Sequence, residues 1–430
     1  MVLEMRKMKD SGIEWIGEIP EGWEIIPVKY LAKYNYDTLA ESCSPDFEFS
    51  YIDIGSVTYT DGITNYQNFK FKDAPSRARR IVHSGDILVS TVRTYLRAVA
   101  CVNEHRLPQI ASTGFLVLQA DISKIHPHFL MYSVLSDNFI CKVEANSVGI
   151  SYPAINASQI VHFKLPIPQL SEQFLLVTYL DRQCSEIDAL LSKTLSSIEE
   201  YKKLKQAVIT QAVTKGVRGE REMKDSGVEW IGEIPAEWSV QRIKTIFSIR
   251  NERNYLPLEQ VNLISLYTDK GVVQHCDIEK TTGNKASNAD GYKKVYPNDM
   301  IVNIILCWMG AIGRSNYAGV TSPAYDVYVP SSKIECKFYH YYFRTLGFSG
   351  DCYKNGRGIM AMRWSTYSDQ FRSIKVVVPP LEEQKEIVGY LDAKCAEIDG
   401  LIAKKEQLIK ELESYKKSLI YEVVTGKREV

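Results

Sequence analysis

Clusters of arginine mixed with hydroxyl and aromatic residues are the parts of this sequence best suited to bind a ligand. Residues 76–80 read Ser-Arg-Ala-Arg-Arg and form the densest positive cluster, and residues 91–97 combine arginine, threonine and tyrosine after a predicted strand. Cationic and hydroxyl groups contact phosphate oxygens, and Arg, Asn, Gln, Ser and Thr side chains can hydrogen-bond to base edges. These residue types favour nucleic-acid binding. A solvated protein surface is the alternative for each cluster taken singly.

The candidate binding residues come from both halves of the chain. In the first half they are Arg77, Arg79, Arg80, Arg93, Thr94, Tyr95, Arg97, Ser147 and Tyr152. In the second half they are Arg253, Asn254, Lys285, Arg314, Asn355, Arg357 and Arg363. The alternative, that each cluster is an ordinary solvated surface, becomes less plausible only if several clusters share one face. Whether they do depends on the fold.

Catalytic motifs are largely missing from the chain. It contains no Gly-x-x-x-x-Gly-Lys-Ser/Thr phosphate loop, no Gly-x-Gly-x-x-Gly after a strand, no His-Glu-x-x-His and no Gly-x-Ser-x-Gly. We therefore expect a binding protein with no catalytic residue, no metal site and no cofactor. An enzyme with a dispersed carboxylate site, such as a nuclease, is one alternative. A structural scaffold that binds proteins is another.

The composition is that of an ordinary globular protein. Lys and Arg number 52, as do Asp and Glu, so any basic surface must be local. The nine scattered cysteines form no Cys-x-x-Cys pair, which favours reduced thiols and a cytoplasmic protein. No apolar run approaches 18 residues, so we expect no membrane span.

The elements that must position these residues occur twice. Residues 179–191 return as 390–402 at an offset of 211, with 8 of 13 positions identical. Around both copies, apolar residues recur at alternating spacings of three and four, which predicts a long helix with one apolar stripe. Such a helix needs a partner, and we predict that the two copies pair as an antiparallel coiled coil acting as a spacer. The alternative is that each helix only covers its own domain.

A second duplicated piece precedes each half. Residues 8–23 recur as 223–238 at an offset of 215, with 13 of 16 positions identical. We call these two pieces the clasps. Their glycines and proline mark turns, and their tryptophans are expected to anchor them to the long helices. We also expect the first clasp to pack beside the end of the second long helix.

The repeats divide the chain into six parts. The boundaries we predict are 1–23 for the first clasp, 24–168 for a variable domain, 169–218 for the central helix, 219–238 for the second clasp, 239–380 for a second variable domain and 381–430 for the C-terminal helix. Alternating apolar residues predict strands at 47–57, 81–89, 98–102, 115–119, 263–267, 300–305 and 325–329. Helices are predicted at 128–144 and 337–346. The expected fold class is α+β, with two mixed α/β domains, two long paired helices and an internal pseudo-two-fold repeat.

The chain resembles the specificity subunits of type I restriction-modification systems over essentially its whole length. Residues 11–20, residues 165–173 (Leu-Pro-Ile-Pro-Gln-Leu-Ser-Glu-Gln) and residues 378–384 (Val-Pro-Pro-Leu-Glu-Glu-Gln) carry the resemblance. In that family a Pro-Pro-Leu-x-Glu-Gln run opens each long helix, and Ile167 interrupts it in the first copy. Residues 85–88 (Gly-Asp-Ile-Leu) are similar to a recurrent piece of the family's target-recognition domains. Residues 297–300 (Pro-Asn-Asp-Met) match it only in part, so we expect a different loop there.

The resemblance implies a non-catalytic reader of double-stranded DNA. Each variable domain would be a target-recognition domain that reads one half of a split, asymmetric site through the major groove, while the paired helices set the spacing. Two modification subunits would dock on the helices and methylate adenine with S-adenosylmethionine. Restriction and translocase subunits that use ATP would join them. The chain itself would work in the cytoplasm, away from membranes.

Overall fold

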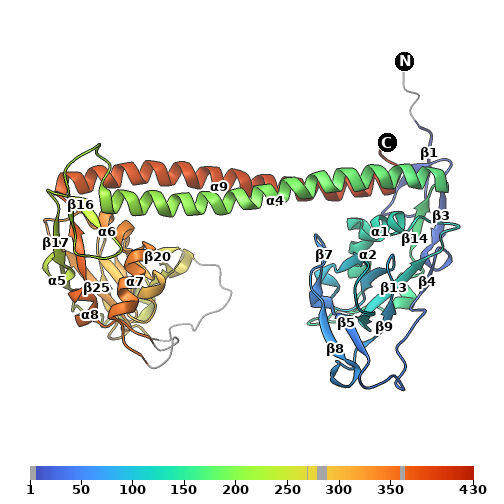
Figure 1. The fold of residues 1–430 in the computed structure, drawn as a ribbon, viewed down its shortest axis with the longest axis horizontal. Coiled ribbons are helices and arrows are strands. Elements are labelled where there is room, and N and C mark those ends of the chain that lie inside the picture. The colour runs from blue at the N-terminus through green and yellow to red at the C-terminus, as the bar shows by residue number, and fades with distance from the viewer. Residues whose placement is uncertain (1–5, 269, 278–287, 359–363) are drawn as a thin grey trace, which may run out of the picture. The chain divides into compact units, whose positions relative to one another are not determined.

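The computed structural model of the chain describes residues 6–268, 270–277, 288–358 and 364–430. The chain forms two compact units, of which the first comprises Met1–Thr194 and Gln407–Val430 and the second comprises Leu195–Glu406. Each unit contains one mixed α/β domain and part of each long helix (Figure 1). Each unit also has its own main hydrophobic core.

Two long helices carry the repeat, and they lie side by side and antiparallel (Figure 1): α4 (Leu170–Lys215) and α9 (Leu381–Val424). Within the first unit, Lys416 donates to Asp188 at 2.6 Å. Within the second unit, Lys205 donates to Asp399, also at 2.6 Å. The two ion pairs are equivalent under the repeat, since 188 + 211 = 399 and 205 + 211 = 416. The predicted antiparallel pairing is confirmed.

The apolar stripe predicted along each helix is wrong at one repeated position. Most of the stripe is buried or half-buried, but Leu204 and its equivalent Tyr415 are exposed. The adjoining Lys205 and Lys416 are less exposed instead, and their amino groups form the two ion pairs. A lysine can take this place because its methylene stem covers apolar surface while its amino group reaches a carboxylate.

Each long helix ends at a glycine. Gly216 and Gly426 follow the last helical turns with φ of 79° and 69°, in the left-handed region that glycine adopts without steric cost. A Cβ at Gly216 would lie 2.7 Å from a carboxylate oxygen of Glu383. A Cβ at Gly426 would lie 2.4 Å from the ring of Pro20 in the first clasp. Glycine is therefore needed at both positions for conformation and for space.

The first domain contains two four-stranded sheets. One is antiparallel, in the order β11-β10-β13-β4 (Val99–Cys101, Ile87–Ser90, Phe115–Ala120 and Ala32–Tyr34). The other has the order β8-β5-β12-β9 (Gln67–Lys70, Glu48–Ile52, Gln109–Ser112 and Ala78–Val82), in which β5 and β12 are parallel. Short antiparallel strand pairs complete the unit: β1 with β2 (Met8–Asp10, Glu18–Pro20), β3 with β14 (Glu24–Pro27, Lys164–Ile167) and β6 with β7 (Val57–Thr58, Gly62–Ile63).

The second domain repeats this topology although its sequence differs. Its antiparallel sheet has the equivalent order β23-β22-β25-β18 (Ile312–Arg314, Met300–Asn303, Tyr325–Pro330 and Phe247–Ile249). Two strand pairs, β19 with β20 (Ile264–Tyr267, Gly271–Gln274) and β21 with β24 (Lys293–Val295, Gly319–Thr321), stand where the first domain has its other sheet. A parallel bridge between Leu263 and Val320 corresponds to the β5–β12 pairing. The pairs β15 with β16 (Met223–Asp225, Glu233–Pro235) and β17 with β26 (Ser239–Arg242, Lys375–Val378) complete the repeat.

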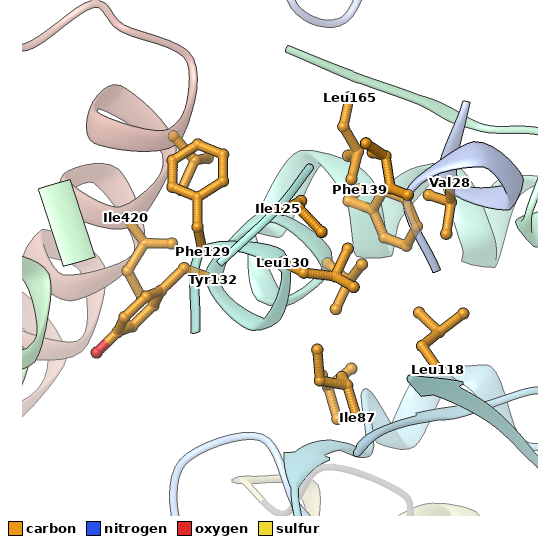
Figure 2. Packing of buried hydrophobic residues seen from close by; sticks show 14 of the residues in the cluster. Val28, Ile87, Leu118, Ile125, Phe129, Leu130, Tyr132, Phe139, Leu165 and Ile420 are labelled. Carbon is orange, nitrogen blue, oxygen red and sulfur yellow. The ribbon is translucent and has the colours of Figure 1, made fainter. Parts of the chain in front are cut away.

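Short helices join each antiparallel sheet to the long helices. They are α1, α2 and α3 in the first domain (Pro127–Leu135, Asp137–Ala145 and Ala157–Ile160) and α5, α6, α7 and α8 in the second (Ile243–Ile246, Cys336–Tyr342, Leu346–Asn355 and Ser368–Ser373). Figure 2 shows how α1 works: Phe129 and Tyr132 lie toward Ile420 of α9, while Leu130 lies toward Ile87 of the sheet. One helix thus buries apolar side chains on two sides and fixes the domain to the long helices.

Several predicted elements are shorter than the sequence indicated. Residues 81–89 form two strands, because Gly85 makes a turn with φ of 90° between them. The predicted helix 128–144 is broken at Ser136, which separates α1 from α2. The predicted helix 337–346 ends with α6 at Tyr342, and Thr345 caps the start of α7. Residues 47–57 form β5, a 3-10 turn (Ile54–Ser56) and the start of β6. In each case a turn or cap interrupts an apolar pattern that continues past it.

The turn expected to differ between the halves is the same in both. Asn298 has a φ of 77°, close to the 90° of Gly85, because asparagine tolerates the left-handed region better than most residues. The buried carboxylate that follows makes the same hydrogen bond in both turns: Asp86 accepts from the backbone N–H of His83, and Asp299 accepts from that of Tyr296. Burial raises the pKa of Asp86. The expectation of a different loop at residues 297–300 was therefore wrong.

Candidate nucleic-acid interface

Two loops of the first domain that the sequence singled out lie together. The backbone N–H of Arg93 donates to the carbonyl of Pro153 at 2.7 Å, and the Thr94 hydroxyl donates to that of Ser147 at 2.9 Å. The guanidinium of Arg93 lies 5.0 Å from the ring centroid of Tyr152, a cation–π distance. Arg93, Tyr152 and Tyr95 are exposed. The fold therefore makes one cationic and aromatic surface from residues 91–97 and 146–153.

The backbone of the first of these loops is strained. Arg93 and Arg97 have φ of 52° and 53° and flank a 3-10 turn (Thr94–Leu96). Residues other than glycine rarely adopt this left-handed region, and such strain concentrates at functional sites. The strain marks residues 93–97 as a candidate binding loop, independently of their charge.

Two of the candidates in this loop are occupied by contacts inside the domain. The guanidinium of Arg97 pairs with Asp137 at 2.5 Å and with Glu144 at 3.0 Å, and its hydrogen bond with Glu144 raises the pKa of the arginine. Thr94 is buried, and its hydroxyl is used by Ser147. Both side chains hold the loop in place and do not present free groups to a ligand.

The densest positive cluster lies next to the same loop. The backbone of Thr113 donates to the Arg77 carbonyl at 2.9 Å, and the next residue, Gly114, accepts from the backbone of Thr91 at 2.8 Å. Arg77 is exposed, whereas Arg79 and Arg80 are half-buried in β9. Arg79 lies over the ring of Phe71 at 5.2 Å, and burial lowers the pKa of Arg80. Of the three arginines, Arg77 is the most accessible to a phosphate.

The second-domain candidates are more scattered. Asn254 is buried, and its amide donates to the carbonyls of Leu256 and Ala289, so it holds its own loop. Asn355 donates to the Asp351 carbonyl at the end of α7. The exposed Arg253 and Arg357 form isolated strand bridges with Lys293 and Ser365, and Arg314 donates to Asn298 and Asn316. Lys285 and Arg363 lie outside the described residues.

Sequence reasoning missed a loop of the second domain that is equivalent to residues 91–97. In the first domain, Ile155 donates its backbone N–H to the Thr91 carbonyl at 2.9 Å. In the second domain, Thr366 donates to the Ile304 carbonyl at 2.8 Å, which aligns residues 304–310 with 91–97 at an offset of 213. The loop exposes Ile305, Leu306 and Met309. It carries no positive charge, so only alignment of the two domains on their strands could have found it.

The described residues contain no group of three or more His, Cys, Asp or Glu side chains that could hold a metal ion. Nor is any helix in the described ranges long and apolar enough to cross a membrane. What the two domains share is a repeated scaffold, on which the exposed residues of the equivalent loops differ.

Comparison with known proteins assigns the chain to a family. Residues 20–200 and 235–413 match the family model described as the type I restriction modification DNA specificity domain. The chain belongs to this family. It is a DNA specificity subunit, the non-catalytic component of a type I restriction-modification enzyme.

Individual proteins agree with this assignment over nearly the whole chain. A Methanocaldococcus jannaschii protein that carries the provisional name type I restriction enzyme MjaX specificity subunit is 28% identical, over 99% of this chain and 98% of its own. A chain from a structure concerned with complex assembly and conformational transition of the type I R-M system has a TM-score of 0.75 and 21% identity, and the match covers 95% of this chain and 99% of that one. The HsdS subunit from Thermoanaerobacter tengcongensis has a TM-score of 0.54 and 22% identity, covering 95% and 98%. The two structures share the fold.

The Glu-Gln pair that opens each long helix of this specificity subunit fastens a clasp and a domain to it. In the first unit, Glu172 pairs with Arg6 at 2.5 Å and accepts from the indole of Trp23 at 3.2 Å. Next to it, Gln173 accepts from the backbone of His126, at the start of α1, at 2.7 Å. The motif is therefore structural, because it joins three segments at one helix end.

The second unit of the specificity subunit repeats these contacts. Glu383 pairs with Arg221 at 2.5 Å and accepts from the indole of Trp238 at 2.9 Å. Gln384 accepts from the backbone of Glu335, at the start of α6, at 2.8 Å. The clasp also meets the other long helix in each unit: Tyr421 of α9 donates to Ile16 in the first clasp at 3.3 Å, and Lys215 of α4 donates to Ile231 in the second at 3.1 Å. The predicted packing of the first clasp beside the end of the second long helix is confirmed.

One clasp contact of the specificity subunit differs between the units. The Trp230 indole donates to Asp351 at 2.7 Å, whereas the equivalent Trp15 has a buried indole N–H without a partner among the described residues. The side chain of Asn146 donates to the Lys142 carbonyl at 2.8 Å, and that of Asn355 donates to the Asp351 carbonyl at the same distance. Lys142 therefore occupies the position that Asp351 has in the second domain. The amino group of Lys142 lies 5.7 Å from the Trp15 ring instead, beside an open pocket.

Proposed function

We propose that this specificity subunit reads a split, asymmetric DNA site, with one half-site for each domain. The observation that carries the proposal is the repeat of one topology with different exposed residues. In the first domain, the equivalent loop presents Arg93 and Tyr95, and in the second it presents Leu306 and Met309. Equal frames with different surfaces suit two readers of different base sequences. We also propose the six boundaries predicted above as the limits of the domains, clasps and helices.

The contacts we propose with DNA follow from exposure. In the first domain they are the exposed Arg77, Arg93, Tyr95 and Tyr152, with the half-buried Arg79 and Arg80 beside them in β9. Ser147 is withdrawn, because its hydroxyl donates to the Val143 carbonyl at 2.8 Å and accepts from Thr94. In the second domain they are the exposed Arg253 and Arg357 together with the exposed loop side chains, and the half-buried Arg314. Lys285 and Arg363 remain candidates from the sequence alone. Thr94, Arg97, Asn254 and Asn355 are withdrawn, because their side chains hold the protein's own loops. Arginine and tyrosine can provide phosphate contacts, base contacts and stacking.

The long helices are proposed to set the spacing and to dock two modification subunits, which methylate adenine with S-adenosylmethionine. Restriction and translocase subunits would then join the complex. Support comes from the solved chain of similar fold, whose structure concerns assembly of a type I R-M system. The zero formal net charge of this chain is consistent with partners that supply part of the binding to the DNA backbone.

The spacing role has a test based on the register of α4 and α9. In both ion pairs the two residue numbers add up to 604, which gives the register of α4 against α9. Asp188 and Lys205 are equally far from the centre of the repeat, which therefore lies between Ser196 and Ser197 on α4. On α9 it lies between Gln407 and Leu408. Inserting seven residues at both points keeps the heptad register and adds about 10 Å of helix. At 3.4 Å per base pair, the unread gap should lengthen by roughly three base pairs.

The assay is methylation mapping in cells that express the chain with its modification subunit. The wild type is expected to methylate adenine in one split motif, and the lengthened chain should methylate the same half-sites at the wider gap. A control that replaces seven residues in place, without lengthening, should leave the gap unchanged. Altered half-site bases at an unchanged gap would contradict the spacer role. A stable complex without any sequence-dependent methylation or DNA binding would instead favour a protein-binding scaffold.

A further inference from the structure

The two domains carry loops of equal length, bounded by equivalent hydrogen bonds, at the end of their equivalent central strands; within them Arg93 is left-handed with a φ of 52°, whereas Leu306 has a φ of −115°. Ser90 at the end of β10 donates its backbone N–H to Ala98 at 2.9 Å, and Asn303 at the end of β22 donates to Ala311 at 3.1 Å. The offset is 213 in both cases, as it is for Thr91 and Ile304. Between these contacts each loop contains one 3-10 turn, Thr94–Leu96 or Cys307–Met309. Residues 92–97 and 305–310, which we call the reading loops, can therefore be compared position by position.

The first reading loop presents a free guanidinium. Arg93 is exposed and has no carboxylate partner within the described part of the chain, in contrast to the neighbouring Arg97. The ring of Tyr152, 5.0 Å away, provides one face against which the guanidinium can be oriented. A guanidinium held by an aromatic ring but unpaired at its N–H edge is arranged to donate two parallel hydrogen bonds to a ligand.

The second reading loop presents apolar side chains at the same place. Leu306 aligns with Arg93 at the offset of 213, and Ile305 and Met309 lie on either side of it in the loop, all of them exposed. Within the loop, the ring of Trp308 lies 5.6 Å from that of Tyr353, which stacks on Trp364 at 4.9 Å. These ring contacts tie the loop to α7 and to Trp364, while Ile305, Leu306 and Met309 stay exposed. Exposed apolar side chains gathered in one loop are suited to contact an apolar group of a ligand.

We propose that position 93/306 chooses the base in each half-site. This inference rests on the proposed function. Arg93 donates to the N7 and O6 of a guanine in the half-site of the first domain. Leu306, together with Met309, contacts the C5-methyl group of thymine in the other half-site. The major groove offers these two features: guanine presents two acceptors there, and thymine presents the one methyl group.

The difference between the loops favours DNA over a protein as the occupant. Two copies of one modification subunit would meet a guanidinium at Arg93 and an isobutyl group at Leu306, although the surrounding fold is the same. A split asymmetric DNA site does offer two different targets to two equivalent loops. Docking of a modification subunit on either loop is kept as an outcome of the test.

The first experiment removes single atoms from the DNA. The full chain, assembled with its modification subunits, is titrated with duplexes that carry the mapped site. Replacing the contacted thymine of the second half-site with deoxyuridine removes only the methyl group and should weaken binding about fourfold, the equivalent of ~0.8 kcal/mol for one methyl-sized group. Replacing the contacted guanine of the first half-site with 7-deazaguanine removes one acceptor and should weaken binding about tenfold.

The second experiment changes the protein. In Leu306→Ala together with Met309→Ala, deoxyuridine and thymine should bind equally well in the second half-site, while the first half-site keeps its response. Leu306→Arg should shift the preference at one base pair of the second half-site from A·T toward G·C. In Arg93→Ala the effect of 7-deazaguanine should vanish. The control Leu346→Ala removes another exposed leucine of the second domain, outside the loop, and should change neither response.

The outcomes separate this inference from the proposed function. Specific binding of the split site with no effect of deoxyuridine anywhere in the second half-site would overturn the inference and leave the proposed function standing. The same holds if deoxyuridine weakens binding equally in the wild type and in the double variant Leu306→Ala with Met309→Ala. If the loop variants lose their modification subunits instead of base discrimination, the loops are docking surfaces and the inference is wrong. If no duplex is bound in a sequence-dependent way, the proposed function itself fails.

Discussion

The clasp contacts allow one residue to be compared with its own repeat inside a single chain. We consider Glu383→Gln and Glu172→Gln, which keep the side-chain volume and remove the charge. Each glutamate pairs with an arginine and accepts from a tryptophan indole at the start of a long helix. The arginine and indole contacts are shared, and the second unit adds Arg218, 3.9 Å from Glu383. Burial is the main difference between the two glutamates.

The magnitudes follow from that burial. The side chain of Glu383 is 0% exposed and that of its partner Arg221 is 14% exposed, whereas Glu172 and Arg6 are 29% and 31% exposed. Breaking a buried ion pair leaves an uncompensated charge and costs about 3–5 kcal/mol, and an accessible pair costs at most about 1 kcal/mol. Because Arg221 keeps a second contact with Glu237 at 2.8 Å, we expect a loss of about 3 kcal/mol for Glu383→Gln. Glu172→Gln should lose about 1 kcal/mol.

The measurement has two parts. Urea unfolding gives the change in the free energy of unfolding, and hydrogen exchange followed on peptides from residues 7–23 and 222–238 shows which clasp has loosened. Faster exchange should be confined to the clasp of the altered glutamate. A suitable control is Glu386→Gln, one turn further along α9, whose pair with Arg218 is exposed and should contribute nothing measurable.

Two results would refute the reasoning. Equal losses in Glu383→Gln and Glu172→Gln would mean that burial does not set the strength of the contact. A loss in Glu383→Gln without faster exchange in residues 222–238 would mean that the glutamate does not hold the clasp. In either case, burial of an ion pair would not be what fastens a clasp to the start of its long helix.

Two further predictions concern single side chains in the domains. Lys142→Asp would place a carboxylate beside the Trp15 indole, as Asp351 does in the other half, and should be about 1 kcal/mol more stable in urea unfolding than Lys142→Ala; equal stability of the two variants would contradict the equivalence. Burial lowers the pKa of His340 from 6.5 to about 3, so the neutral ring stabilises the fold fully above pH 6.5, and that stabilisation falls as the pH drops toward 3. We expect a loss of about 3 kcal/mol by pH 4, and a smaller pH dependence in His340→Gln; an unchanged dependence in that variant would show that other groups cause it.

The organisation of the chain could be predicted because it depends on repetition and periodicity. The paired helices, the clasps and most strands follow from identical residues at offsets of 211 and 215 and from apolar spacing. Local breaks were harder to predict. The helix break at Ser136 and the strand break at Gly85 lie inside continuous apolar patterns, and Asn298 replaces a glycine by tolerating the same left-handed backbone.

The candidate site could be predicted only in part, because a residue type does not reveal its partners. Arg93 and Arg97 look alike in the sequence, yet one is free and the other is held by Asp137 and Glu144. Asn254 has the chemistry to read a base but spends its amide on backbone carbonyls.

The sequence by itself determined that this protein is a duplicated specificity subunit, since repeats and motifs are properties of the chain. Only the tertiary structure decided which side chains are available to DNA. The equivalence of Arg93 and Leu306 is the clearest case, because the two loops share no residue pattern and are matched only by the backbone hydrogen bonds on either side of them. Hydrogen bonds between segments far apart in the chain set that equivalence, and local sequence carries no record of them.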